Sequence, residues 1–138
     1  MIKEIVKDIE FLSQKSEVVK FEEVAELIRD LIDTAKDHIN SCVGLAAPQI
    51  GELKRVIVVR NGNTFSPMVN PAILKRTGNR FASKEGCLSL EGERVVMRSP
   101  QVMVSYLDSN GKRQTKNFSG LAAIVIQHEV DHLNGVLI

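Results

Sequence analysis

The pentapeptide His128-Glu129-Val130-Asp131-His132 holds two of the three histidines of the chain. On a helix, residues four apart lie on one face, so both imidazole rings can bind the same metal ion. Glu129 places a carboxylate beside whatever else that ion binds. The alternative is a chance match on a buried helix, which residue frequencies put at about a few chains of this length in a thousand. We therefore predict a metal-binding helix.

A catalytic site of this type usually has a third protein ligand and an open position for water. Cys87 is the better candidate, because its thiolate suits zinc or ferrous iron and the only other cysteine is Cys42. The alternative for Cys87 is a buried, inert thiol. A divalent ion with these ligands would lower the pKa of its bound water, and Glu129 could act as the acid and base.

Length and composition narrow the class of protein. The 138 residues, 43% of them hydrophobic, predict a single domain over 1–138 with a real core. A net charge of +1 gives no case for binding nucleic acid or an anionic membrane. We find no signal peptide and no apolar segment long enough to span a bilayer. Two cysteines do not form a disulfide framework, so we expect a cytoplasmic protein.

Two segments show helical periodicity. Phe21–Asn40 carries an apolar stripe, which leaves charged residues such as Asp30 facing water and His38 near the helix end, where it is not expected to be a ligand. Gly120–Asn134 is apolar almost all round, which predicts a central, buried helix, and Gly135 is placed to end it.

Short strands are predicted between the two helices. Arg55–Arg60 is rich in valine, and Met68–Leu74 contains Pro71, which favours an edge strand or a bulge. Alternation from Val102 and a turn signal near residues 108–111 predict a hairpin that returns to Phe118. The fold class is therefore α+β, with antiparallel strands around a central buried metal-binding helix and an N-terminal amphipathic helix.

A third unusual segment, Cys42–Gln49, reads Cys-Val-Gly-Leu-Ala-Ala-Pro-Gln. By itself it could be an ordinary connection between a helix and a strand. With Glu85–Ser89 (Glu-Gly-Cys-Leu-Ser) and Gln127–His132, however, it resembles the three motifs of the peptide deformylase family, in the same order. The resemblance covers essentially the whole chain. It implies an enzyme that removes the formyl group from the N-terminal formylmethionine of peptides and nascent proteins.

The resemblance also implies roles for particular residues. The metal is expected to be ferrous iron, with zinc or nickel also able to occupy the site, and the substrate is expected to pair as an extra strand near Gly44. Cys87, His128 and His132 are the implied ligands, Glu129 the acid and base, Gln49 and the Leu88 backbone N–H the donors to the formyl oxygen, Val43, Leu121, Ile124 and Val125 the methionine pocket, and Arg94 a substrate contact.

Some alternatives stay open. Cys42 stands where the family loop has its first glycine, so a shifted loop could misplace Gln49 and leave a weak or inactive protein that only binds metal or formylated peptide. A third hypothesis, supported only by the His-Glu-x-x-His motif, is a general metallopeptidase that cleaves ordinary amides. Asp131 could orient a histidine or pair at the surface, and Glu85 could meet Arg94 or Arg98. Because the chain stops at Ile138, we expect transient ribosome proximity without docking through a C-terminal tail.

Overall fold

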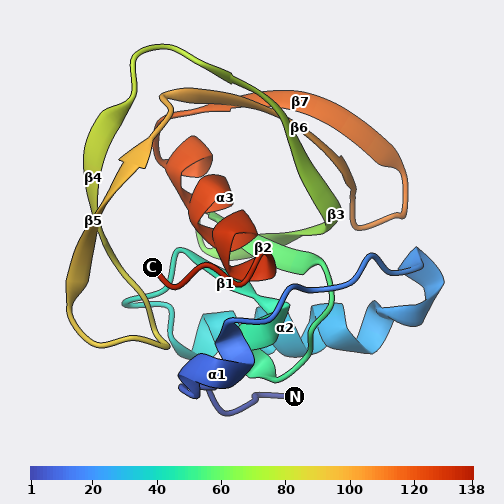
Figure 1. The fold of residues 1–138 in the computed structure, drawn as a ribbon. Coiled ribbons are helices and arrows are strands. Elements are labelled where there is room, and N and C mark those ends of the chain that lie inside the picture. The colour runs from blue at the N-terminus through green and yellow to red at the C-terminus, as the bar shows by residue number, and fades with distance from the viewer.

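The computed structural model describes residues 1–138 and has an α+β architecture in which one helix lies between two antiparallel sheets (Figure 1). None of its helices combines the length and apolarity that crossing a membrane requires. The helices are α1 (Ile9–Leu12), α2 (Ala25–Asp37) and α3 (Gly120–Leu133), with 3-10 turns at Phe21–Glu23 and Ala47–Ile50. The strands are β1 (Gly44–Ala46), β2 (Val56–Asn61), β3 (Thr64–Thr77), β4 (Phe81–Gly86), β5 (Glu93–Arg98), β6 (Gln101–Leu107) and β7 (Arg113–Ser119).

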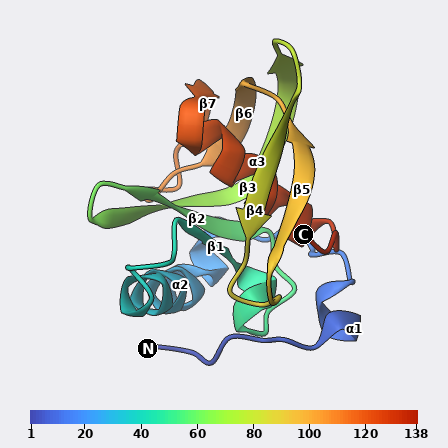
Figure 2. The same cartoon turned by 90° about the vertical axis from the view of Figure 1, so that its left-hand side faces the viewer.

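The larger sheet separates two apolar cores. Its strand order is β1-β2-β3-β6-β7, and every pairing is antiparallel. One core joins α2 to β1 and β2, while the other joins α3 to β2, β3 and β6. Strands β4 and β5 form a separate ribbon, which lies across α3 from the larger sheet (Figure 2). The metal-binding motif on α3 is therefore enclosed between the two sheets.

Helix α3 is central and buried, as its apolar composition predicts. It ends where Gly135 adopts a left-handed φ of +74°, a conformation that glycine adopts without steric cost. Carbonyl groups at a helix end need partners, and here the Leu133 carbonyl accepts from the Ser16 N–H at 2.8 Å and from Arg55 Nη1 at 3.2 Å. The N-terminal segment and Arg55, which directly precedes β2, thus hold the last turn of the metal-binding helix.

The predicted helix over Phe21–Asn40 is present but is divided by a break at Val24. His38 is its C-terminal cap residue, as expected from its position. The expectation that Asp30 faces water is wrong. Asp30 is 5% exposed, because the N-terminal amine of Met1 lies 2.9 Å from its Oδ1 and the N-terminal segment covers it. An ion pair of this kind leaves no trace in helical periodicity.

Of the two alternatives predicted for Pro71, an edge strand or a bulge, strand β3 contains the bulge. The pairing of β3 with β6 shifts register between Val69 and Ala72, and Asn70 there has a φ of +51°, so the bulge is real. The edge-strand alternative is wrong, since β3 is the middle strand of the sheet. The bulge removes the need for a ladder N–H at Pro71 and allows proline in a central strand.

The β4–β5 ribbon was not predicted from the sequence. Most of its residues are exposed or half-buried, with only Glu85 and Arg98 buried, and both strands are rich in charged side chains. Charged residues are uncommon in strands, so they conceal the pattern. The ribbon matters because its inner face, which includes Glu85 and Arg98, packs on α3 through polar contacts.

We predict that Gly135→Ala destabilises the protein more than Gly62→Ala. Both glycines have positive φ, which costs an alanine about 1–2 kcal/mol. A Cβ at Gly62 would meet nothing within 4 Å, whereas one at Gly135 would collide with the backbone of Ser13. Urea unfolding of the two variants separates conformational from steric cost. Equal losses would mean that the N-terminal segment yields and does not brace α3.

Candidate metal centre

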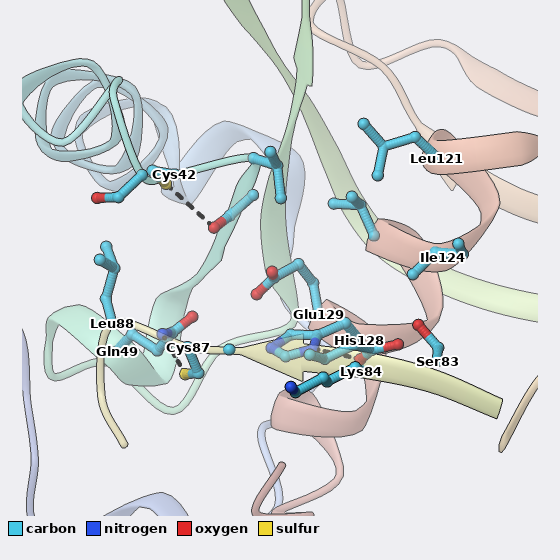
Figure 3. Close-up of a pocket in the computed structure, with 16 residues that line it drawn as sticks. Cys42, Gln49, Ser83, Lys84, Cys87, Leu88, Leu121, Ile124, His128 and Glu129 are labelled. Atoms are coloured by element: carbon cyan, nitrogen blue, oxygen red, sulfur yellow. Dashed lines mark hydrogen bonds and ion pairs between the residues drawn. The ribbon is translucent and has the colours of Figure 1, made fainter. Parts of the chain in front are cut away.

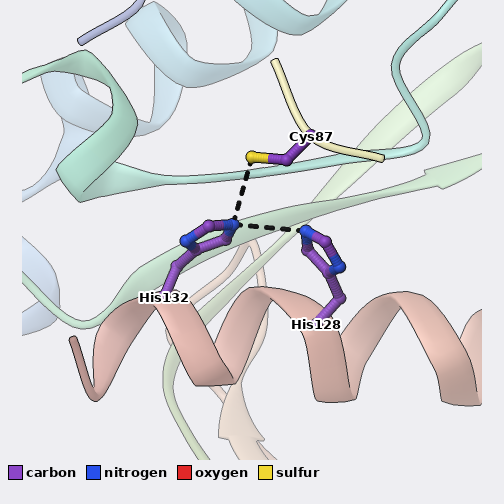
Figure 4. A group of neighbouring side chains, drawn as sticks. All are labelled: Cys87, His128 and His132. Atoms are coloured by element: carbon purple, nitrogen blue, oxygen red, sulfur yellow. Dashed lines mark hydrogen bonds between the residues drawn. The ribbon is translucent and has the colours of Figure 1, made fainter. Parts of the chain in front are cut away.

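Three side chains converge on one point between α3 and the β4–β5 ribbon (Figure 4). The ligand atoms of Cys87, His128 and His132 all lie within 4.8 Å of one another. His132 Nε2 is 3.2 Å from His128 Nε2 and 3.4 Å from Cys87 Sγ. Bond lengths of about 2.0 Å to nitrogen and 2.3 Å to sulfur in a tetrahedral site put ligand atoms about 3.3–3.6 Å apart. The donor set therefore fits one divalent cation.

The three residues come from two different elements. His128 and His132 lie one turn apart on α3, and both are buried. Cys87 follows directly after β4, where the ribbon turns toward β5. The position of the thiol therefore depends on how the ribbon packs on the helix, while the two imidazole positions depend on α3 alone.

Glu85 and Arg98 make this packing specific. Glu85 Oε1 lies 2.7 Å from His128 Nδ1, and the Arg98 guanidinium donates to both Glu85 oxygens at 2.7 and 2.9 Å. Arg98 also donates to Asp131 Oδ2 at 2.6 Å. Burial would raise the pKa of Glu85, but the hydrogen bonds from His128 and Arg98 lower it to about 2. Glu85 is therefore ionised and orients the His128 ring.

These contacts decide two questions that the sequence left open. Glu85 pairs with Arg98 and not with Arg94, and it is Glu85 that bonds a histidine ring. Asp131 has a side chain that is 24% exposed, and it bonds Arg98. Asp131 therefore does not contact a histidine. It holds Arg98, Arg98 holds Glu85, and Glu85 orients the His128 ring.

Burial also favours a neutral ring at His132. Its pKa is lowered to about 3 by burial and by the positive charge of the neighbouring His128. A neutral imidazole has a nitrogen lone pair free to bind a cation. Burial would lower the pKa of His128 as well, but hydrogen bonds with Cys87 and Glu85 raise it to about 10, so the surroundings of this ring favour a positive charge.

Glu129 is the one carboxylate of the site that is left without a full set of partners. It is 4% exposed, and its Oε1 has no hydrogen-bond partner. Burial raises its pKa to about 7, far above that of an exposed glutamate. A buried carboxylate without a hydrogen-bond partner, with a pKa near 7 and next to the metal ligands, is suited to proton transfer.

A cavity of about 330 Å³ opens beside Glu129 and the metal ligands (Figure 3). Arg94 is not among its lining residues; its Nη1 donates to the Glu91 carbonyl at 3.0 Å, and its role as a substrate contact stays a prediction. The cavity is lined by most of the residues singled out from the sequence, namely Val43, Gly44, Gln49, Cys87, Leu88, Leu121, Ile124, Val125, His128 and Glu129, together with Ser41, Cys42, Ser83, Lys84, Glu85 and Gly86.

The Gln49 amide has a defined orientation at one wall of this cavity. Its Oε1 accepts from the Ala46 N–H at 3.0 Å, which only the oxygen of the amide can do. Its Nε2 consequently points the other way, 3.4 Å from Cys87 Sγ and 3.3 Å from Ser89 Oγ. The donor end of Gln49 therefore faces the metal ligands.

Cys42 does not distort the loop that contains it. Its φ is not positive, so the position does not need the backbone freedom of glycine. Its thiol donates to the Gly44 carbonyl at 3.2 Å, and burial raises its pKa to about 12, which keeps it protonated. Both cysteines are free. The close packing lies at Gly44, where a Cβ would be 2.6 Å from Val125 Cγ1 and 3.0 Å from Glu129 Oε2.

Two residues of this site escaped the sequence analysis. Ser89 is 4% exposed and contacts both Gln49 and Cys87, although it was considered only as part of a motif. Arg98 was named only as one possible partner of Glu85. A buried arginine in a polar strand has no distinctive spacing, so only the contacts identify it.

Comparison with known proteins agrees with this geometry. The sequence model of the family described as polypeptide deformylase matches residues 2–138. A peptide deformylase of Clostridium beijerinckii is 46% identical over 138 residues, covering all of both chains. A Legionella pneumophila peptide deformylase structure superimposes with a TM-score of 0.89 at 37% identity, covering 99% of this chain and 83% of that one.

A second solved structure is informative because of its ligand. It is the Met-Ala-Ser-bound class I type b peptide deformylase from Acinetobacter baumannii, with a TM-score of 0.88 and 32% identity over 99% of this chain and 96% of that one. The whole-chain match, the high identity and the shared fold agree with the cysteine–histidine–histidine site. This chain therefore belongs to the polypeptide deformylase family, enzymes that remove the formyl group from an N-terminal methionine.

Proposed function

We propose that residues 1–138 act as one catalytic unit. This unit hydrolyses the amide bond between the formyl group and the N-terminal methionine, with a divalent ion held by Cys87, His128 and His132. Ferrous iron is the metal that the sequence resemblance favours, and zinc and nickel are the alternatives. The observation that carries the mechanism is the buried Glu129, whose Oε1 has no partner and whose pKa is raised to about 7. A cation held by these three residues would supply Lewis-acid chemistry, a positive charge that makes water a stronger acid.

Glu129 moves the proton in this mechanism. A carboxyl group with a pKa near neutrality exists in both forms at pH 7, so it can accept a proton from water and return it. The acceptor of the returned proton is the amine of methionine, which leaves when the formyl C–N bond breaks. No other carboxylate of the site is free for this role, since Glu85 is held by His128 and Arg98.

The formyl oxygen becomes negatively charged during attack and needs hydrogen-bond donors. Gln49 Nε2 faces the metal ligands, and Leu88 lines the same cavity, so we assign this role to the Gln49 amide and the Leu88 backbone N–H. Each such donor contributes about 3 kcal/mol of transition-state stabilisation. Gln49 is 2% exposed, so water competes little for its amide.

The substrate binds along the open edge of β1. The Val43 carbonyl accepts from the Arg60 N–H at 2.9 Å, so Gly44, the next residue, directs its backbone groups away from β2 toward the cavity. A peptide can pair there as an added strand, with its methionine side chain against Leu121, Ile124 and Val125. The related enzyme with bound Met-Ala-Ser supports this class of ligand.

The substrates are accordingly formylmethionyl peptides and nascent chains, which the enzyme meets in the cytoplasm and transiently near the ribosome. A reducing compartment suits a site that depends on a free Cys87 thiol. Neither nucleic acid nor a membrane is needed for this activity, and the net charge of +1 gives no electrostatic attraction to either.

Glu129→Gln should lower the rate of formate release from formyl-Met-Ala-Ser at least about a hundredfold, because an amide cannot carry the proton. The metal content should stay at one ion per chain, since Glu129 is not a ligand. Glu26→Gln, at an exposed position of α2, is the matched control and should keep full activity. Unchanged turnover by the metal-loaded Glu129→Gln protein would disprove the role of Glu129.

Cys42→Gly should change turnover by less than about threefold, because Cys42 imposes no strain and Gln49 is correctly oriented beside it. The variant should lose about 1–2 kcal/mol of stability, since it leaves a small cavity at a residue that is 2% exposed. Cys42→Ala separates loss of the thiol from added backbone freedom. A large gain in turnover with glycine would show instead that Cys42 impairs the loop.

Glu85→Gln should weaken metal retention about 10- to 100-fold, because the His128 ring loses its ionised partner. Competition with a chelator, followed by metal analysis, measures this effect without reference to activity. Glu93→Gln, a half-exposed glutamate on β5, is the control. Equal metal retention in the Glu85→Gln and Glu93→Gln proteins would show that Glu85 only joins the ribbon to α3.

A further inference from the structure

We propose that Ser89 is a positioning residue for deformylation, which acts by holding the Gln49 amide so that one N–H is directed at the formyl oxygen. The inference rests on the proposed role of Gln49 as a donor to that oxygen. It concerns a contact deep in the protein, since Ser89 and Gln49 are 4% and 2% exposed. Ser89 itself touches no substrate in this proposal.

The amide nitrogen of Gln49 is held from two directions. Acceptance from the Ala46 N–H by Oε1 at 3.0 Å fixes which end of the amide faces the site. The Nε2 atom carries two protons in the plane of the amide, about 120° apart, and each needs an acceptor when buried. Ser89 Oγ, 3.3 Å away, accepts one of them.

The second proton is the one available for chemistry. In the structure, Nε2 also lies 3.4 Å from Cys87 Sγ, on the side of the metal ligands. A formyl oxygen that approaches this side is a better acceptor for an N–H than sulfur is. With Ser89 engaging the first proton, the amide plane is fixed and the second N–H stays directed at the reacting group, which is the preorganisation that transition-state stabilisation requires.

Ser89 is also tied to the ligand itself. Its backbone N–H donates to Cys87 Sγ at 3.4 Å, so the serine hydroxyl, the glutamine amide and the metal-binding sulfur form one connected group. Substitution of the side chain leaves this backbone contact in place, so the hydroxyl can be tested without removing a partner of Cys87.

The test is a double-mutant cycle of Ser89→Ala and Gln49→Ala, measured by formate release from formyl-Met-Ala-Ser. We expect Ser89→Ala to lower kcat about tenfold with KM changed less than twofold, and Gln49→Ala to lower kcat about a hundredfold. In the Gln49→Ala background, Ser89→Ala should have no further effect, because it acts only through that amide. Ser16→Ala is the control, since Ser16 Oγ is buried, lacks a partner and lies outside the cavity.

A second measurement does not depend on turnover. In the zinc-loaded protein, the two Nε2 proton resonances of Gln49 should be well separated in a ¹⁵N–¹H spectrum, with Gln49→Ala identifying them by their loss. Ser89→Ala should shift them and speed their exchange with solvent, while metal content and thermal unfolding stay close to those of Ser16→Ala. Unchanged resonances would overturn the positioning role.

The kinetic outcomes distinguish the two proposals. Equal losses from Ser89→Ala with and without Gln49 would overturn the inference and indicate a structural serine, while the role of Gln49 would stand. Full activity of Gln49→Ala would overturn both, because Ser89 would then have no donor to orient. Coupled losses, with altered Gln49 resonances, would establish Ser89 as a positioning residue.

Discussion

The contact between the Glu85 carboxylate and the His128 ring joins the two parts on which the metal centre depends. Two ligands lie on α3, but the third lies at the end of a ribbon that shares few apolar contacts with that helix. The ribbon is held instead by charge, with Arg98 bonded to Glu85 and to Asp131. Loss of one charge would leave another buried without a partner, which is the costly case for a buried ion pair. The position of Cys87 is therefore set by electrostatics, and that of the histidines by helix geometry.

Glu129 differs from the other buried polar residues of the site in its hydrogen bonding. Buried polar groups are normally fully hydrogen-bonded, and Glu85, Gln49 and Arg98 follow this rule. Glu129 does not, and burial raises its pKa as a result. Gly44 lies directly against it and leaves no room for a side chain. A destabilised carboxylate at a reacting centre is the pattern expected where local stability is lost to chemistry.

The sequence was sufficient to predict the parts of the molecule that follow a period or a motif. Helix α3, the β6–β7 hairpin and the two histidines were predicted from regular spacing, and Cys87 from its ligand chemistry and its motif. The β4–β5 ribbon was missed, since its charged strands do not show apolar alternation. The choice of Arg98 over Arg94 as the partner of Glu85 depends on how the ribbon packs on α3, and so does the link from Ser89 to Gln49. No local pattern encodes such contacts between distant segments.

The way in which α3 is held has a consequence for how the protein folds. The Leu133 carbonyl at the end of this helix is bonded by Ser16, so segments from opposite ends of the sequence must meet before the last helical turn is secured. Contacts of such large sequence separation form slowly, because closing the long intervening loop costs entropy. During synthesis, both histidine ligands also emerge after every strand of the two sheets. Completion of the metal centre is thus a late event in folding. A chain that retains its metal ion has therefore already formed both sheets and the contact between its two ends.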